Sequence, residues 1–196
     1  MAAPEPPFQF WRSRIGGATG ECGVSLRFRS DDEQGIDGKG RVSIPAAFRP
    51  VIAAGDHLMA QGERPTFVIV YGTDSLNHLR CYTRKEMEKI EERIELLDEG
   101  TEEREIAETF FLGSSMDVQL GDDGRIVLPQ RLRKKLDLDD RIYFIGVGSH
   151  FKMWKPETYK AHEAGRTDAL IVERGGARFD PASLLPKLPP KPTPAV

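Results

Sequence analysis

Polar and apolar residues alternate strictly along residues 41–44 of this chain, which read Arg-Val-Ser-Ile. Residues 125–128, Arg-Ile-Val-Leu, begin with the same order of side chains. Alternation is typical of a strand with one face on the core and the other in solvent. We therefore expect a short strand at each place, with Arg41 facing outward.

A proline follows each of these segments, at the position favoured for the first residue of a helix. The expected helix starts are Pro45 and Pro129. Apolar side chains then recur four residues apart, Phe48 with Ile52 and Leu132 with Leu136, which places each pair on one helix face.

Further apolar runs predict more strands. They are residues 57–59, 66–71 and 141–147, and two strands that end near Tyr82 and Trp154. Helices are expected to start at Thr83 and Lys155. Residues 84–111 predict a helical hairpin, because the apolar positions Met87, Ile90, Ile94 and Leu97 have the spacing of one helix face.

The two segments belong to an internal repeat, which becomes visible when the sequence is shifted by 84 residues. Four identical pairs then align: Gly40 with Gly124, Arg41 with Arg125, Pro45 with Pro129, and Arg49 with Arg133. Residues 78–87 resemble 150–159 at a shift of 72, so the first copy carries a twelve-residue insertion. Neither copy has enough apolar residues for a core of its own, and we expect the two to complete each other.

This organisation predicts five regions. They are a poorly ordered extension (1–26), a first repeat (27–82), a linking helical hairpin (83–111), a second repeat (112–162) and a Pro-rich tail (163–196).

The formal net charge of −3 is unevenly distributed along the chain. Residues 84–108 hold eleven acidic and five basic side chains, a balance of −6, so the remaining residues carry +3. No apolar run approaches the roughly 20 residues of a membrane helix, and the N-terminus lacks the continuous apolar core of a secretory signal. We predict a cytoplasmic protein with no membrane partner.

Metal and catalytic chemistry find little support. Cys22 and Cys81 stand alone, and the histidines, His57, His78, His150 and His162, are scattered as surface or turn residues would be. The sequence lacks the nucleophile-elbow and zinc-protease motifs. We expect no enzyme, no cofactor, no metal and no small-molecule substrate.

The loop at residues 37–41, Asp-Gly-Lys-Gly-Arg, fits neither a phosphate-binding loop nor a calcium loop. It predicts a hairpin in which Asp37 pairs with Arg41 across the glycine turn, with Lys39 at the tip. Taken alone, this is a surface salt bridge. Presented twice, an exposed arginine on a glycine-bordered strand suits contact with phosphates and guanine edges in the DNA major groove.

Other basic residues lie near these elements in sequence. They are Arg27, Arg29, Arg49, Arg131, Arg133, Lys134 and Lys135. Some are expected only to cover the solvent face of a helix. The candidate DNA-binding residues are Arg41, Arg125, Lys39, Asp37 and Arg29.

The segments DGKGRVSIPAAFR, DGRIVLPQRLR and VGSHFKMWKPETY resemble the MraZ family of bacterial transcriptional regulators over about residues 28–162. The resemblance implies a mixed α+β, mainly β fold, with tandem SpoVT-AbrB-type swapped-hairpin repeats forming a pseudo-symmetric barrel with a helical hairpin. It also implies a nucleoid-associated homo-oligomeric ring. Such a ring would bind repeated double-stranded DNA elements upstream of the division and cell-wall gene cluster and repress it.

The family signature D-x-x-x-R is present as Asp37 with Arg41, but Gly121 replaces the aspartate four residues before Arg125. The second arginine should therefore be held differently or more weakly. The chain also begins about 26 residues before the family's usual start, so these residues are either an added tail or lie before a later translation start. Two alternatives stay open, an AbrB-like antitoxin whose Pro-rich tail binds a toxin, and a regulatory scaffold that does not bind DNA.

Overall fold

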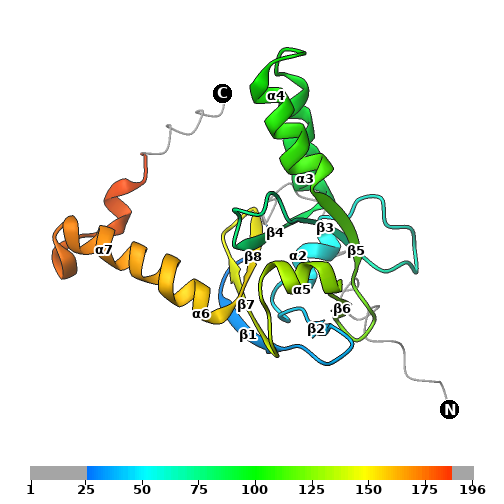
Figure 1. The fold of residues 1–196 in the computed structure, drawn as a ribbon, viewed down its shortest axis with the longest axis horizontal. Helices are drawn as coiled ribbons and strands as arrows, with labels where there is room; N and C mark the ends of the chain where they lie inside the picture. The colour runs from blue at the N-terminus through cyan, green and yellow to red at the C-terminus, as the bar shows by residue number, and fades with distance from the viewer. Residues whose placement is uncertain (1–25, 187–196) are drawn as a thin grey trace, which may run out of the picture. The chain divides into compact units, whose positions relative to one another are not determined.

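A computed structural model of the chain describes residues 26–186, and two compact units divide it, Met1–Pro156 and Glu157–Val196. The strands of the first unit are β1 (Asp31–Gly35), β2 (Arg41–Ser43), β3 (Thr66–Val70), β4 (His78–Thr83), β5 (Ser115–Gln119), β6 (Arg125–Val127), β7 (Arg141–Gly146) and β8 (His150–Trp154). Its helices are α2 (Arg49–Ala54), α3 (Arg84–Glu95), α4 (Glu102–Ala107), the π-helical turn η1 (Glu108–Gly113) and α5 (Gln130–Lys135) (Figure 1).

Six strands form one antiparallel sheet in the order β1-β7-β8-β4-β3-β5, and β2 pairs with β6 in a separate ribbon. β1 lies against β7, with Gly35 opposite Arg141, and β5 lies against β3, with Thr66 opposite Gln119. The first strand of each half of the chain therefore pairs with a strand of the other half. The fold is mixed and mainly sheet, as expected, but the sheet does not close into a barrel within residues 26–186.

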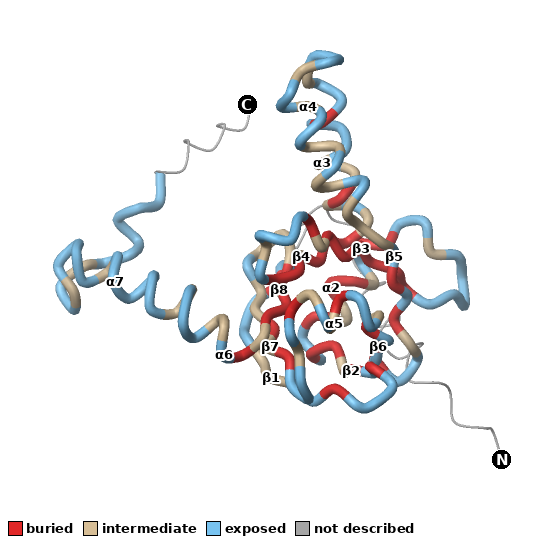
Figure 2. The backbone as a smooth tube through the Cα atoms, viewed as in Figure 1, coloured by how far each residue is buried: buried red, intermediate tan, exposed pale blue. Residues whose placement is uncertain are grey.

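The main core lies between the six-stranded sheet, the ribbon and helices α2 and α5 (Figure 2). Phe151 of β8 stands at its centre, with ring centroids 5.0 Å from Phe28, 5.1 Å from Phe48 and 5.6 Å from Phe67. These rings come from both halves of the chain, so neither half keeps its core without the other.

A second, smaller core covers the outer face of β3 and β4. Val68, Val70 and Tyr82 pack there against Met87 of α3, and Phe110 packs on the same cluster. All five residues of β3 are buried because both of its faces are covered, which explains its unbroken apolar run.

The helical hairpin is confirmed, and a threonine caps the start of each helix. The Thr83 hydroxyl accepts from the Glu86 N–H at the start of α3, and the Thr101 hydroxyl accepts from the Arg104 N–H at the start of α4. Arg104 also donates to the Leu97 carbonyl at 2.9 Å, which ties the second helix to the end of the first.

Two expected elements are wrong. α2 begins at Arg49 rather than at Pro45, because a helix begun at Pro45 would hold Pro50 in its interior, where the proline ring has no N–H and clashes with the preceding turn. Residues 57–59 form a turn and loop rather than a strand, and the first-half strand that pairs with β4 is β3. β1 and β5 were not predicted at all.

His78 is also placed differently from the surface position expected for it. It is buried on β4 and its ring stacks on Trp154 at 4.3 Å, while the His150 ring stacks on Tyr82 at 4.8 Å. Cys81 on the same strand is buried with a free thiol, and Cys22 lies outside the described residues.

The unit Glu157–Val196 is described up to residue 186 and is helical over much of that length. Beyond α6 (Pro156–Tyr159) it contains η2 (Lys160–Ala164), α7 (Gly165–Glu173), η3 (Gly176–Arg178) and η4 (Pro181–Leu184). The expected extension before residue 26 and the last part of the expected tail lie outside the described residues. No helix within residues 26–186 is long and apolar enough to span a bilayer.

The stacked histidines predict a pH-dependent stability. Burial, together with the charges of Lys152 and Arg80, lowers the pKa of His78 to about 3 and that of His150 to about 4. Below the ordinary value of 6.5 the unfolded chain binds protons that the folded chain does not, so the free energy of unfolding falls as the pH drops from 6.5 towards 4.

Denaturant unfolding of the wild type and of His78→Gln at a series of pH values checks this. The variant should lose less stability between pH 6.5 and pH 4, because it lacks one of the two imidazoles, and acidic groups shared by both proteins cancel in the comparison. Identical pH dependence in the two proteins would contradict the role of His78.

Candidate nucleic-acid interface

The two glycine turns that precede β2 and β6 have the same pattern of main-chain hydrogen bonds. In the first turn the Asp37 N–H donates to the Arg41 carbonyl at 3.1 Å, and in the second the Gly121 N–H donates to the Arg125 carbonyl at 2.8 Å. The Gly40 N–H donates to the Asp37 carbonyl at 2.8 Å in the first turn. The Gly124 N–H donates to the Gly121 carbonyl at 2.9 Å in the second. The two turns therefore have matching main-chain hydrogen bonds.

A glycine in the left-handed region ends each turn and joins it to the other half of the chain. Gly40 has a φ of 81° and Gly124 a φ of 73°. The Gly40 carbonyl accepts from the Leu128 N–H at 2.8 Å, and the Gly124 carbonyl accepts from the Ile44 N–H at 2.9 Å. These two bonds flank the β2–β6 ribbon, so each turn is fixed by the other half of the chain.

An arginine packs over each of these glycines. Arg49 donates through Nε to the Ile44 carbonyl at 2.8 Å and lies where a Cβ on Gly124 would be. Arg133 donates to the Leu128 carbonyl at 3.2 Å and lies over Gly40. Both guanidinium groups therefore hold the ribbon in place, a role that sequence reasoning missed although the shift of 84 aligns each glycine and each arginine.

The ribbon presents both candidate arginines on one exposed face. Val42 and Ile126 are buried beneath it, whereas Arg41 and Arg125 are half exposed, at 50% and 52% of their side-chain surface. Arg41 stands opposite Val127, and Ser43 stands opposite Arg125. The two arginines therefore occupy diagonal corners of a small two-stranded surface.

Asp37 holds Arg41 in a fixed position. One carboxylate oxygen accepts from the backbone N–H groups of Lys39 and Arg41, each at 2.9 Å, and the other accepts from the Arg41 Nε at 2.6 Å. The Arg41 backbone and guanidinium bonds lower the pKa of Asp37 to about 2. The pairing predicted from the sequence is confirmed.

Arg125 is held more loosely, as the glycine at position 121 led us to expect. Asp123 accepts from the Arg125 backbone N–H at 3.1 Å, and the Arg125 Nε lies 3.8 Å from the other Asp123 oxygen. Asp122 instead pairs with Arg64, whose Nε lies 3.0 Å from it.

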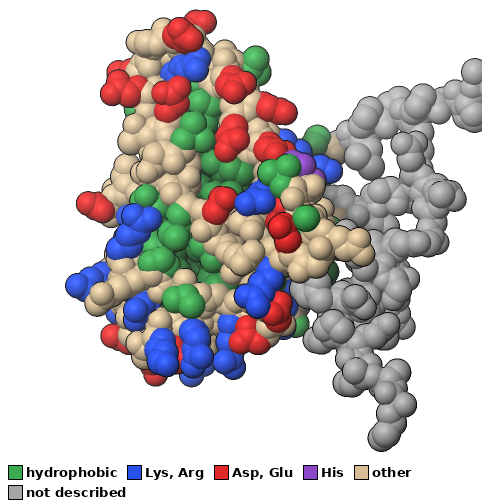
Figure 3. All heavy atoms as spheres, turned by 90° about the vertical axis from the view of Figure 1, so that its right-hand side faces the viewer, with side chains coloured by type: hydrophobic (Ala, Val, Ile, Leu, Met, Phe, Trp, Pro, Cys, Tyr) green, Lys and Arg blue, Asp and Glu red, His purple; other side chains and the backbone are tan. Residues whose placement is uncertain are grey.

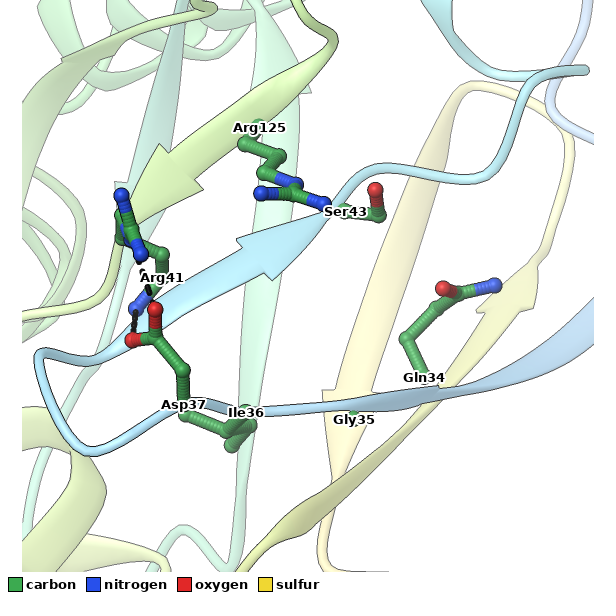
Figure 4. A pocket seen from close by; sticks show the side chains of 7 residues that line it. All are labelled: Gln34, Gly35, Ile36, Asp37, Arg41, Ser43 and Arg125. Atoms are coloured by element: carbon green, nitrogen blue, oxygen red, sulfur yellow. Dashed lines mark hydrogen bonds and ion pairs between the residues drawn. The ribbon is translucent and has the colours of Figure 1, made fainter.

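A hollow of about 350 Å³ lies between β1, β2 and β6 (Figure 4). Seven residues line it: Gln34, Gly35, Ile36, Asp37, Arg41, Ser43 and Arg125. Figure 4 shows the Arg125 guanidinium extending across β2 beside the Ser43 hydroxyl, while Arg41 points away alongside Asp37. The hollow therefore offers hydrogen-bond donors from both strands of the ribbon.

The charged side chains of this unit separate towards its two ends. Figure 3 shows Lys and Arg gathered at the lower end, where Figure 1 places β2 and β6, and Asp and Glu on the α3–α4 hairpin at the upper end. Lys39 belongs to the first turn at the basic end. Arg29 does not, since it lies beside Gly146, at the opposite end of β1 from Asp37. Among residues 26–186, no group of three or more His, Cys, Asp or Glu side chains could hold a metal ion.

Comparison with known proteins points to one family. A family model described as "MraZ protein, putative antitoxin-like" matches residues 111–170. The chain is 42% identical to a protein of Ruegeria sp. (strain TM1040) over 162 residues, which cover 83% of this chain and 96% of that protein. It is 38% identical, with the same coverage, to a protein of Ruegeria pomeroyi, and 33% identical to one of Rickettsia akari over 69% of this chain and 85% of that protein. All three relatives are named "Transcriptional regulator MraZ".

The cross-repeat contact predicts that Gly40→Ala is destabilising. An alanine there would take a left-handed backbone and place its Cβ 2.7 Å from the Leu128 carbonyl, so we expect the free energy of unfolding to fall by at least about 1–2 kcal/mol. Gly38→Ala is the matched control, because its Cβ would meet no atom within 4 Å. Denaturant unfolding of both variants measures the difference, and equal stabilities would contradict the contact.

The hydrogen bonds that Asp37 accepts from Lys39 and Arg41 predict that its carboxylate stays ionised down to low pH. Because the folded pKa of Asp37 is lowered, its contribution to stability is present above about pH 4 and is lost as the pH falls towards 2. In Arg41→Ala the backbone N–H bonds stay and the guanidinium bond is lost, so the pKa should rise part of the way towards 3.8. Carboxyl-carbon NMR titration measures it, and Arg125→Ala, which leaves Asp37 untouched, should not move it.

Proposed function

The chain belongs to the MraZ family, and we propose that it is a sequence-specific DNA-binding transcriptional regulator. The observation that carries this proposal is the β2–β6 ribbon, which displays Arg41 and Arg125 on one exposed face of a rigid frame. The major groove admits a two-stranded ribbon, and arginine is the side chain that most often contacts guanine there. The acidic α3–α4 hairpin lies at the other end of this unit, so the ribbon can approach DNA without it.

We further propose that the two halves are pseudo-symmetric SpoVT-AbrB-type repeats with exchanged hairpins. Three observations support this: the sheet order, in which β1 and β5 each pair with a strand of the other half; the shared hydrogen bonds of the two turns; and the crossed glycine–arginine contacts. The pseudo-twofold axis would pass through the centre of the ribbon. It would relate Arg41 to Arg125.

The proposed regulator acts as a homo-oligomeric ring that represses the division and cell-wall gene cluster. One ribbon offers few contacts to DNA, so its affinity should be low and should weaken with salt, as counterions released from the phosphates return. A ring presents several ribbons at once, and binding of one repeated element makes binding of its neighbours intramolecular. Occupation of the promoter in this way blocks transcription.

An antitoxin is the second candidate function, because the matching family model is described as antitoxin-like. In that case the unit Glu157–Val196 would bind the toxin, and its exposed apolar residues would supply the contact. Within the described part of the unit they are Leu170, Val172, Leu184 and Leu185. A chain ending at Pro156 would then lose a co-purifying toxin and keep its DNA binding.

The test of the DNA-binding proposal is a titration of the chain with its own upstream region and with a scrambled duplex, at two salt concentrations. The oligomer mass is recorded on the same sample. We expect preference for the upstream duplex, an affinity that falls with salt, and a large oligomer. An intact oligomer that binds neither duplex, or both equally, would overturn the proposal and favour a regulatory scaffold.

Arg41→Ala should reduce binding of the upstream duplex by about tenfold or more, because one bidentate base contact contributes roughly 1–3 kcal/mol. Its oligomer mass should not change, since the Arg41 side chain is half exposed and, within residues 26–186, its guanidinium is held by Asp37. Arg93→Ala is the matched control, because it removes the same charge from the exposed surface of α3. If Arg41→Ala dissociates the oligomer, the Asp37–Arg41 pair is structural.

A further inference from the structure

The two glycine turns have matching main-chain hydrogen bonds but differ in the side chain that holds the arginine. The matching hydrogen bonds and left-handed glycines make the two frames equivalent, so the difference lies in the side chains alone. Asp37 supplies three hydrogen bonds to the first turn, whereas Gly121 supplies no side chain to the second. The two arginines are therefore presented to a ligand in different ways.

Arg41 is prepared for a contact of fixed geometry. Its Nε is bonded to Asp37 at 2.6 Å, which orients the guanidinium plane and leaves the two terminal nitrogens directed away from the carboxylate. A planar pair of donors that is already oriented loses little side-chain freedom on binding. It matches the paired acceptors of a guanine edge.

The residue opposite Arg41 in the ribbon strengthens this assignment. Val127 is 60% exposed on the same face, because side chains alternate along β6 and its neighbour Ile126 is buried. An apolar side chain on a DNA-facing surface contacts the methyl group of thymine, which no other base carries in the major groove. Arg41 and Val127 together offer contacts to two different base edges.

Arg125 is prepared for an adaptable contact. Its Nε lies 3.8 Å from Asp123, and its guanidinium reaches over the hollow beside the Ser43 hydroxyl (Figure 4). A mobile cation with a neighbouring hydroxyl suits a phosphate, which accepts hydrogen bonds from many directions and carries no sequence information. The hollow lies at the edge of the ribbon, where a DNA backbone would pass beside a strand inserted in the groove.

We propose that the exposed face of the ribbon is divided into a base-reading half, Arg41 with Val127, and a phosphate-binding half, Arg125 with Ser43. The inference rests on the proposed DNA-binding function and adds to it the assignment of specificity to one of the two repeats. Asp37 acts as a positioning residue for Arg41. The glycine at position 121 leaves Arg125 free to follow the DNA backbone.

Matched arginine-to-lysine substitutions test the division, because lysine keeps the charge and loses the planar pair of donors. Binding of the upstream and scrambled duplexes is measured for the wild type, Arg41→Lys and Arg125→Lys. Arg41→Lys should lower the preference for the upstream duplex by about tenfold, as expected for loss of a bidentate base contact. Arg125→Lys should keep that preference and stay within about threefold of wild-type affinity on both duplexes, because a phosphate accepts either cation.

The outcomes separate the two proposals. A wild type that shows no preference for the upstream duplex overturns the DNA-binding function and this inference with it. A specific wild type whose preference falls equally in both lysine variants overturns the division alone. Arg125→Ala is a further test of the phosphate contact. It should weaken binding to both duplexes alike and reduce the dependence of affinity on salt.

Thymine replaced by uracil throughout the upstream duplex tests Val127 without changing any hydrogen bond to the bases. The wild type should bind the uracil duplex more weakly, and Val127→Ala should bind the two duplexes with a smaller difference. An equal loss in wild type and variant would remove Val127 from the base-reading half.

The double substitution Gly121→Asp with Asp123→Lys rebuilds the first turn in the second. Position 121 has no left-handed φ, and a Cβ there would lie 2.8 Å from the Asp123 carboxylate, which the second substitution removes, and 3.0 Å from the Arg125 carbonyl oxygen, which requires a shift of a few tenths of an ångström. The new aspartate should hold the Arg125 guanidinium away from the hollow. The variant should then bind both duplexes more weakly than the wild type. Unchanged binding would show that this aspartate does not decide the role of the arginine.

Discussion

The crossed contact between the two halves is the constraint on which the rest of the structure depends. The carbonyl oxygens of Gly40 and Gly124 each accept a hydrogen bond from the other half of the chain. From that half, Arg133 packs over Gly40 and Arg49 packs over Gly124. Each turn depends on the other half of the chain, because both the hydrogen bond to its glycine and the arginine that covers it come from there. The arginine fits only because the glycine lacks a Cβ and adopts a positive φ. The same exchange joins β1 to β7 and β5 to β3, and it places the phenylalanines of both halves in one core. Ribbon, sheet and core therefore form together.

This constraint also explains how exposed side chains can be arranged with accuracy on short strands. β2 and β6 have three residues each, too few to be stable as an isolated pair. They persist because Val42 and Ile126 are buried beneath them and because the glycine bonds flank them. The arginines thus project from a surface that is fixed from below, which lowers the entropy lost when they bind. The acidic hairpin is a separate addition, capped by its own threonines, and it keeps its charge at the other end of the unit.

Sequence patterns predicted those features that arise from local spacing. Alternation located β2 and its exposed arginine, helical spacing located the hairpin, and the shift of 84 located both turns. Elements that depend on distant partners were missed. β1, Asp-Asp-Glu-Gln-Gly, has no apolar side chain and is a strand because it pairs with β7. His78 was expected at the surface because a stacking ring on another strand cannot be inferred from spacing. Arg49 and Arg133 carried the right signal, a repeated glycine and a repeated arginine, but only the fold shows that each pair crosses between the repeats.

Two turns with the same main-chain hydrogen bonds and different side chains can hold their arginines in different ways. Because the hydrogen bonds of the turns are made by the main chain, replacing an aspartate with glycine at position 121 leaves the frame intact and changes only the freedom of one guanidinium. The local charge changes with it, since Lys39 accompanies the first arginine and two aspartates accompany the second. Arg64 neutralises one of those aspartates, which limits the repulsion that a phosphate would meet beside Arg125. The difference between the arginines is therefore compatible with two turns of the same backbone, and a side-chain change in either turn can alter how its arginine is presented without disturbing the contact that holds the two halves together.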